Sequence, residues 1–176
     1  MLYMVTGGVP FYLSKIKWKE SAMFIIEKLA FSKKAFFLDE FDSLFSSLFN
    51  DSEEHVKLVR ILAGHRYGIG KTRLLSLVGS TGGNSAKRLQ ELEDAGFVIH
   101  FKPLYHQSRG TYYRLDDEYT YFYLKWIEPI KSLLQERALE KGHFQSMRLT
   151  PEWNSWLGYA FESVCYKHLT QIRRKL

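Results

Sequence analysis

Cysteine is almost absent from this sequence, with Cys165 as the single example among 176 residues. One cysteine excludes a disulfide framework and any zinc site built from several cysteines, and it fits a reducing compartment. No apolar run reaches the roughly 18 residues that a membrane-spanning helix needs. The opening residues MLYMVTGGVP also lack the basic region and the long apolar stretch of a signal peptide. These absences predict a cytoplasmic protein that does not enter a membrane.

Catalytic and metal-binding patterns are also lacking. The six histidines show no HExxH pattern or other metal-ligand spacing. Residues 68–72, Gly-Ile-Gly-Lys-Thr, end like a Walker A phosphate loop, but His65 stands where that loop needs its first glycine. The residues before this run have helical spacing, whereas the loop must follow a buried strand. We therefore expect a turn here and, for this chain alone, no catalytic residue, metal site or cofactor.

The positive charge is concentrated in the middle of the chain. The formal net charge is +6, and 45% of the residues are hydrophobic, as in a folded globular protein. Resolved along the sequence, the net charge is −1 for 1–53, +6 for 54–114, −3 for 115–164 and +4 for 165–176. A local excess of cations is the electrostatic footprint of a polyanion partner. DNA is accordingly the partner that we expect for 54–114.

Hydrophobic spacing predicts an α+β fold that is mainly α, in three segments. The first, 1–52, is expected to be helical, with helices at 10–16, 21–29 and 37–49. Pro10 is expected to begin the first of these, and Ser21 to cap the second, with Phe24, Ile25 and Leu29 on its apolar side. The second, 53–116, is expected to contain helices at 55–64, 71–79 and 84–95, the last ended by Gly96, and strands at 97–101 and 111–115. The third, 117–176, is expected to contain a helix capped by Asp117 and further helices at 130–141 and 153–169. Helix, helix, tight turn, helix and β-hairpin is the order of a winged helix-turn-helix.

The winged-helix prediction specifies which side chains would contact DNA. If Ala86, Leu89 and Leu92 face the core, Ser85, Lys87 and Arg88 face outward, toward phosphates or base edges. The second helix and the hairpin would add further cations. The predicted nucleic-acid-binding residues are Arg66, Lys71, Arg73, Ser85, Lys87, Arg88, Lys102, His106, Arg109 and Arg114. A solvated basic face, or a protein-interaction module that uses the hairpin, is the alternative interpretation.

Several short segments, taken in order, resemble the C-terminal half of the prokaryotic archaeal-type or DEXX-box ATPases, a family related to AAA+ proteins. The matching segments are Thr6-Gly7-Gly8-Val9-Pro10 with Tyr12-Leu13, Glu40-Phe41…Leu44-Phe45…Leu48-Phe49, Leu89…Leu92-Glu93…Gly96-Phe97-Val98, Tyr113-Arg114-Leu115…Asp117…Phe122-Tyr123 and Trp153…Trp156…Gly158…Ala160-Phe161-Glu162. Each segment is short, and their order along almost the whole chain carries the resemblance.

The resemblance implies a helical ATPase lid at 1–52, a winged helix at 53–116, and at 117–176 a helical segment leading into a truncated nuclease-like region. It implies that Gly7, Gly8 and Pro10 lie near the adenine of ATP. It also implies that Glu162 assists metal binding where a full nuclease-like domain is present. The sequence departs from the family in having no Walker A and no Walker B motif.

The expected protein is therefore a C-terminal fragment of an ATPase whose P-loop domain, in cis or in trans, binds ATP and magnesium. The fragment itself would bind DNA without catalysis. A regulatory protein-interaction module of the ATPase and a free-standing winged-helix transcription regulator are the two alternatives.

Overall fold

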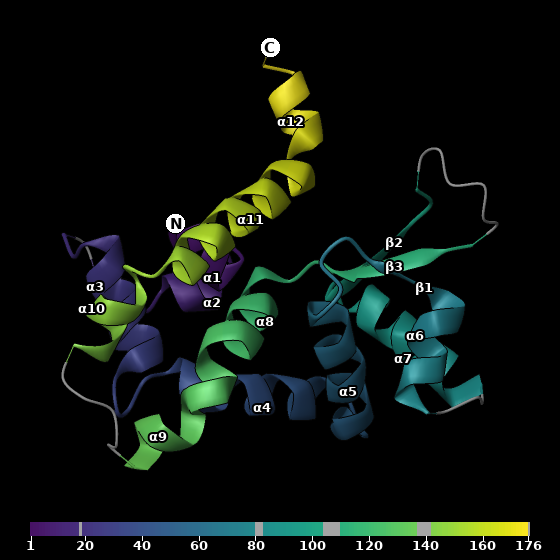
Figure 1. Cartoon of the computed structure of the whole chain (residues 1–176), viewed down its shortest axis with the longest axis horizontal. Helices are drawn as coiled ribbons and strands as arrows, with labels where there is room; N and C mark the ends of the chain where they lie inside the picture. Colours follow the sequence, from purple (N-terminus) through teal and green to yellow (C-terminus); the bar gives the residue numbers. More distant parts are fainter. Residues whose placement is uncertain (18, 80–82, 104–109, 137–141, 176) are drawn as a thin grey trace. The chain divides into compact units, whose positions relative to one another are not determined.

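The computed structural model describes residues 1–17, 19–79, 83–103, 110–136 and 142–175 (Figure 1). These residues are mainly helical and include a three-stranded antiparallel sheet, which confirms the predicted α+β class. None of the described helices combines the length and the apolar character that crossing a lipid bilayer requires. The chain divides into two compact units: unit 1 is Met1–Leu38 with Lys125–Leu176, and unit 2 is Asp39–Leu124.

Unit 2 contains the middle segment of the sequence-based division, and unit 1 contains both ends of the chain. The proposed boundaries at 52 and 116 remain predictions. The elements of unit 2 are α4 (Phe37–Leu48, which begins in unit 1), α5 (Ser52–Ala63), β1 (Ile69–Gly70), α6 (Lys71–Val78), α7 (Gly83–Asp94), β2 (Val98–Phe101), β3 (Tyr112–Leu115) and α8 (Glu118–Phe122). The predicted helices and both predicted strands are confirmed, whereas β1 was not predicted.

The sheet of unit 2 has the strand order β1-β3-β2. Strand β3 lies in the middle, so Tyr113 pairs with Ile69 on one side and with His100 on the other. Two residues of β1 are too few to show the alternating pattern by which a strand is recognised in a sequence. The pairing nevertheless ties the start of α6 to the hairpin, since the Lys71 N–H donates to the Thr111 carbonyl at 2.9 Å.

Helices α5, α6 and α7 share one apolar core with the sheet. Five leucines and a valine from these elements are at most 1% exposed: Leu58, Leu62, Leu74, Leu89, Leu92 and Val98. Aromatic rings join α4 and Tyr123 to this core. Phe45 contacts Phe97 with ring centroids 4.8 Å apart, and Phe41 stacks on Tyr123 at 4.2 Å with the rings 3° from parallel.

Two predicted helix boundaries of unit 2 are confirmed, one at the end of α7 and one at the start of α8. Gly96 has a φ of +81°, a left-handed conformation that favours glycine, and it follows the end of α7. Asp117 caps α8, because its Oδ2 accepts a hydrogen bond from the Thr120 N–H at 2.6 Å. Both features were expected from the sequence.

Unit 1 is built from several short helices and the longer α11 around a tryptophan cluster. Trp153 is fully buried, and its ring centroid lies 4.9 Å from those of both Trp126 and Trp156. The elements are α1 (Leu2–Thr6), α2 (Pro10–Leu13), α3 (Ala22–Ile26), the π-helical η1 (Glu27–Phe31) and η2 (Tyr123–Ile127, shared with unit 2), the 3-10 helix η3 (Glu128–Ile130), α9 (Lys131–Glu136), α10 (His143–Met147), α11 (Pro151–Lys167) and α12 (Leu169–Arg173).

The predicted start signals of unit 1 are confirmed in two cases. Pro10 occupies the first turn of α2, and the Ser21 hydroxyl caps α3 by accepting from the Phe24 N–H at 3.3 Å. The expectation that Phe24 packs on the apolar side of its helix is wrong, because its side chain is 53% exposed while Ile25 and Leu29 are buried. Helices α1, α10 and α12 were not predicted.

Candidate nucleic-acid interface

The predicted DNA-binding residues fall into distinct groups in the structure. His106 and Arg109 lie outside the described residues. Ser85 does not face outward as expected: its side chain is 1% exposed on the inner face of α7, with Leu89 and Leu92 one and two turns later. The reason is the helical period, which places positions i, i+4 and i+7 on one stripe. Ser85 is therefore removed from the set of candidate contacts.

Lys71, Arg73 and Lys102 form the exposed cation group. All three side chains are exposed, and none of them makes an ion pair within the part of the chain that the structure describes. Lys71 and Arg73 lie in the first turn of α6, which starts directly after β1. Lys102 follows the last residue of β2. These charges are available to an external anion.

The strand register brings two of these cations to the same end of the sheet. Phe101 of β2 and Gly70 of β1 are both paired with Tyr112 of the central strand. Lys102 and Lys71, the residues that follow them, therefore lie on opposite sides of Thr111. Since neighbouring strands are about 4.8 Å apart, the two backbones are roughly 10 Å apart at this end. The exposed cation group thus spans the width of the sheet.

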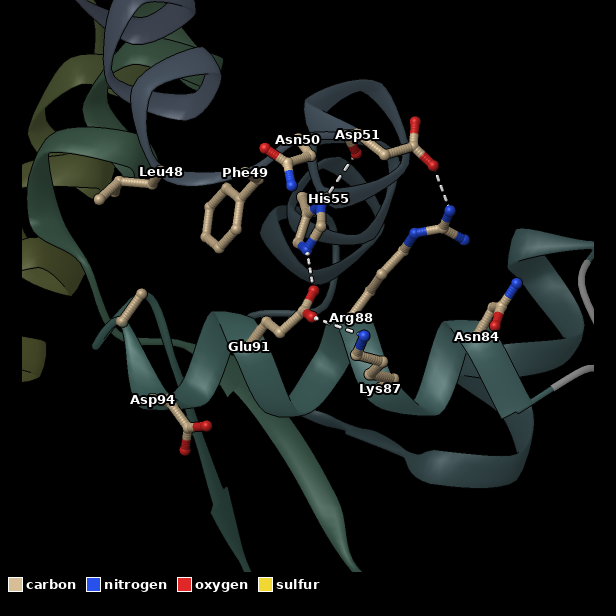
Figure 2. A pocket seen from close by; sticks show the side chains of 11 residues that line it. Leu48, Phe49, Asn50, Asp51, His55, Asn84, Lys87, Arg88, Glu91 and Asp94 are labelled. Carbon is tan, nitrogen blue, oxygen red and sulfur yellow. Dashed lines mark hydrogen bonds and ion pairs between the residues drawn. The ribbon is translucent and has the colours of Figure 1, made fainter.

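Lys87 and Arg88, the two cations expected to lead DNA recognition from α7, each face a carboxylate of unit 2. The Arg88 guanidinium pairs with Asp51, the residue before α5. The Lys87 ammonium lies 3.7 Å from Glu91, one turn later on α7. Figure 2 shows both pairs on the side of α7 that faces the start of α5. Lys87 remains 77% exposed, whereas the Arg88 side chain is only 19% exposed.

His55 joins these two ion pairs and was not identified from the sequence as a functional residue. Its ring is 3% exposed and stacks on Phe49 with centroids 4.0 Å apart and planes 11° from parallel. Its Nδ1 lies 2.9 Å from the Asp51 carbonyl oxygen and its Nε2 lies 2.8 Å from Glu91 Oε2. The Glu91 carboxylate therefore contacts both His55 and Lys87 (Figure 2).

The hydrogen bonds of His55 constrain where its protons lie. A carbonyl oxygen can only accept, so Nδ1 carries a hydrogen and donates it to Asp51. Nε2 faces the Glu91 carboxylate, so the imidazole bridges the backbone before α5 and a side chain of α7.

An open pocket of about 600 Å³ lies beside this network. Phe49 and Leu48 provide its apolar wall, and Asn84 and Asp94 add polar groups from the two ends of α7 (Figure 2). Mixed charges line it, with Lys87 and Arg88 set against three carboxylates, so the pocket has no strong preference for a ligand of one sign. Among the described residues, no group of three or more His, Cys, Asp or Glu side chains could hold a metal ion.

Arg66 and Arg114 lie near the hydroxyl of Tyr121. Burial raises the pKa of Tyr121 above its ordinary value of 10.0, and the two guanidinium groups partly offset that increase. Arg114 also pairs with Asp116 at 3.5 Å, and the Arg66 guanidinium lies 4.9 Å from the centre of the Tyr67 ring. Both arginines are half-buried, so they are less accessible to a polyanion than the exposed cation group.

Gly7, Gly8 and Pro10, which the family resemblance placed near adenine, form the turn between α1 and α2. Gly7 has a φ of +62° and ends α1, and Gly8 has a φ of +74°. A Cβ atom at Gly8 would lie 2.5 Å from the Tyr3 ring. Close packing therefore accounts for this glycine without a ligand, and the adenine contact remains a prediction. Glu162 is half-buried on α11.

Comparison with known proteins adds one relative. The uncharacterized protein MJECL04 of Methanocaldococcus jannaschii is 24% identical to this chain over 179 aligned residues. The alignment covers 98% of this chain, which spans 38% of the length of that relative. No protein-family model matches the sequence. No solved structure matches it either.

Proposed function

We propose that the elements from α5 to β3 form a winged helix-turn-helix that binds duplex DNA. The order of three helices and a β-hairpin, with a short strand between the first two helices, supports this assignment. In this arrangement α6 and α7 are the helix-turn-helix pair, and β2 and β3 form the wing. The described residues on both sides of the wing, including Lys102, would approach the phosphate backbone.

The exposed cation group is the observation that carries the proposal. Lys71, Arg73 and Lys102 gain nothing from neighbouring described carboxylates, so they can neutralise phosphates without first breaking an internal ion pair. Each phosphate neutralised by a lysine or arginine releases condensed counterions from the duplex. Binding is therefore expected to weaken steeply as the salt concentration rises, with little dependence on sequence.

The test is a fluorescence-anisotropy titration of the chain against a labelled duplex at several salt concentrations. Lys71→Ala, Arg73→Ala and Lys102→Ala should each reduce the slope of log K against log salt by about 0.9. Lys57→Ala is the matched control, because Lys57 pairs with Glu54 on α5 and its removal costs the same formal charge. Absence of salt-dependent binding, or equal effects of all four variants, would contradict DNA binding at this surface.

We further propose, from the family resemblance, that this unit belongs to an AAA+-related ATPase and supplies binding without catalysis. The relative from Methanocaldococcus jannaschii extends well beyond the matched region, which is compatible with additional domains. The test is the genomic sequence that precedes the codon for Met1. A P-loop and a hydrophobic Asp-Glu motif, in frame or one frameshift away, would support the proposal, and their absence would contradict it.

A protein-interaction module is the second candidate, and the state of α7 favours it. A helix that reads bases presents free cations and amides to the groove, whereas Lys87 and Arg88 are engaged with carboxylates of their own unit. Leu77 on the neighbouring α6 is 51% exposed, as is common for a contact residue of a protein interface. Protein binding that survives Lys71→Ala and Arg73→Ala, without DNA binding by the parent chain, would establish this candidate.

A further inference from the structure

Two carboxylates, Asp51 before α5 and Glu91 on α7, pair with the α7 cations that the winged-helix prediction assigns to phosphates. Asp51 pairs with Arg88 from 37 positions earlier in the chain, and Glu91 lies 3.7 Å from the Lys87 ammonium. Carboxylate and phosphate oxygens accept the same charge-assisted hydrogen bonds from arginine and lysine. An internal carboxylate competes well for these cations because it is tethered beside them, whereas a phosphate must first bind from solution.

The partners of Asp51 and Glu91 show that these carboxylates are held in place. Asp51 precedes α5 without using its side chain to cap that helix. Its backbone carbonyl instead accepts a hydrogen bond from His55 Nδ1 at 2.9 Å, while its carboxylate is directed to Arg88 (Figure 2). Glu91 is fixed by His55 Nε2 at 2.8 Å. One buried ring thus contacts the backbone of Asp51 and the carboxylate of Glu91.

We propose that Asp51 and Glu91 form an electrostatic mask over Arg88 and Lys87 that limits how strongly α7 binds a polyanion. The inference rests on the proposed function. DNA first meets the exposed cation group, and α7 contributes only when phosphates exchange with the two carboxylates. His55 is a positioning residue for the mask, and the charged groups that surround it are Asp51, Glu91, Lys87 and Arg88.

The salt dependence of binding distinguishes the mask from a simple effect of net charge. When a phosphate binds a masked cation, the DNA releases a counterion, but the carboxylate that loses this cation takes one up from solution. The net release of counterions is therefore about zero. Removing that carboxylate frees the cation, so the salt dependence of binding should become steeper. A carboxylate with no cation beside it changes only the long-range field, which salt screens over about 8 Å at physiological ionic strength.

Asp51→Asn and Asp94→Asn form the matched pair that tests the mask. Both variants raise the net charge by one and keep the shape of the side chain. Asp94 is on the same helix and beside the same pocket, but its Oδ1 accepts from Gln90 Nε2 at 2.9 Å rather than from a cation. Asparagine is also a favourable residue before a helix, so Asp51→Asn should leave α5 folded, which circular dichroism would verify.

In anisotropy titrations with a labelled duplex, Asp51→Asn should bind about three- to tenfold more tightly than the parent and steepen the salt slope by about 0.9. Asp94→Asn should change affinity less than twofold. Adding Arg88→Ala to Asp51→Asn should return both quantities to the parent values. Equal gains from the two single variants, or a gain that persists without Arg88, would overturn the mask. A parent chain that shows no salt-dependent binding would instead overturn the proposed function.

Discussion

His55 Nε2 of α5 lies 2.8 Å from Glu91 Oε2 of α7, although 36 positions separate the two residues in the chain. The imidazole is 3% exposed and the carboxylate side chain is 38% exposed. The pair links two helices of unit 2, with its imidazole buried and its carboxylate partly exposed to solvent. Its effect on folding differs from that of a surface ion pair, because the buried partner loses its hydration whether or not the contact forms.

A double-mutant cycle with His55→Ala and Glu91→Ala should give a coupling free energy of about 1–2 kcal/mol. His55→Ala alone should destabilise unit 2 further, by about 2–3 kcal/mol, since it also removes the stacking on Phe49 and the donor to the Asp51 carbonyl. Urea unfolding at neutral pH measures each free energy.

The matched control for that cycle is His100 with Glu93, which pair between β2 and α7 with the imidazole as the exposed partner. The residue types are the same, but the His100 side chain is 58% exposed. Surface ion pairs contribute about 0–1 kcal/mol, so this cycle should give a coupling free energy below about 0.5 kcal/mol. Similar coupling in both cycles would show that burial of His55 does not strengthen its contact with Glu91.

Gly68→Ala should destabilise unit 2 by about 2 kcal/mol or more. Gly68 has a φ of +90°, a conformation that costs a residue with a side chain about 1–2 kcal/mol. A Cβ atom there would also lie 2.8 Å from two carbons of the Phe101 ring. Gly83→Ala on α7 is the control, because a Cβ atom meets nothing within 4 Å there. Thermal unfolding should separate the two variants, and equal midpoints would contradict the steric argument.

Tyr121→Phe should leave stability unchanged or raise it by up to about 1 kcal/mol. The Tyr121 hydroxyl is inaccessible to water and has no hydrogen-bond partner within the described ranges of the chain. A buried polar group without a partner costs about 1–3 kcal/mol, so its removal is not expected to destabilise the protein. Urea unfolding at neutral pH checks this, and a loss above 1 kcal/mol would indicate a hydrogen bond that Tyr121 makes in solution.

The same variant carries a pH signature. Burial raises the pKa of Tyr121 above 10.0, so ionisation of this group does not lower the free energy of unfolding while the pH stays below 10. As the pH rises past 10, Tyr121 ionises first in the unfolded chain, and the free energy of unfolding falls until the pH passes the folded-state pKa. Tyr113, whose pKa is raised by burial and by Glu93, remains in both proteins. The parent should therefore lose stability faster than Tyr121→Phe above pH 10, and parallel curves would contradict this.

The helices of unit 2 could be predicted from the sequence because their apolar residues recur at helical spacing. Val59, Leu62, Leu89 and Leu92 are all buried where that spacing places them. The same rule failed at Ser85, because a small polar residue on the inner stripe of α7 gives no hydrophobic signal. Strand β1 was missed because it consists of only two residues, and the partner strand that stabilises it begins more than 40 positions later.

The positive charge of the candidate interface could be predicted from the sequence, but the ion pairs within it could not. An excess of cations can be counted in 54–114, but the sequence does not state which of them meet carboxylates. Arg88 and Asp51 are 37 positions apart, and their contact depends on the packing of α7 against the start of α5. Lys71 and Lys102 come to one end of the sheet only through strand register. Long-range packing therefore decides which cations remain available.

Trp153→Ala should destabilise unit 1 by about 3–5 kcal/mol, the usual cost of deleting a fully buried tryptophan. Its ring contacts Trp126, Trp156 and Phe144, and the deletion leaves a cavity that these rigid neighbours cannot fill. Phe161→Ala on the same helix is the control, because that ring is 60% exposed and its loss should cost less than about 1 kcal/mol. Urea unfolding followed by tryptophan fluorescence compares both variants with the parent. Equal destabilisation by the two variants would contradict this argument, because it would mean that the Phe161 ring is buried rather than exposed.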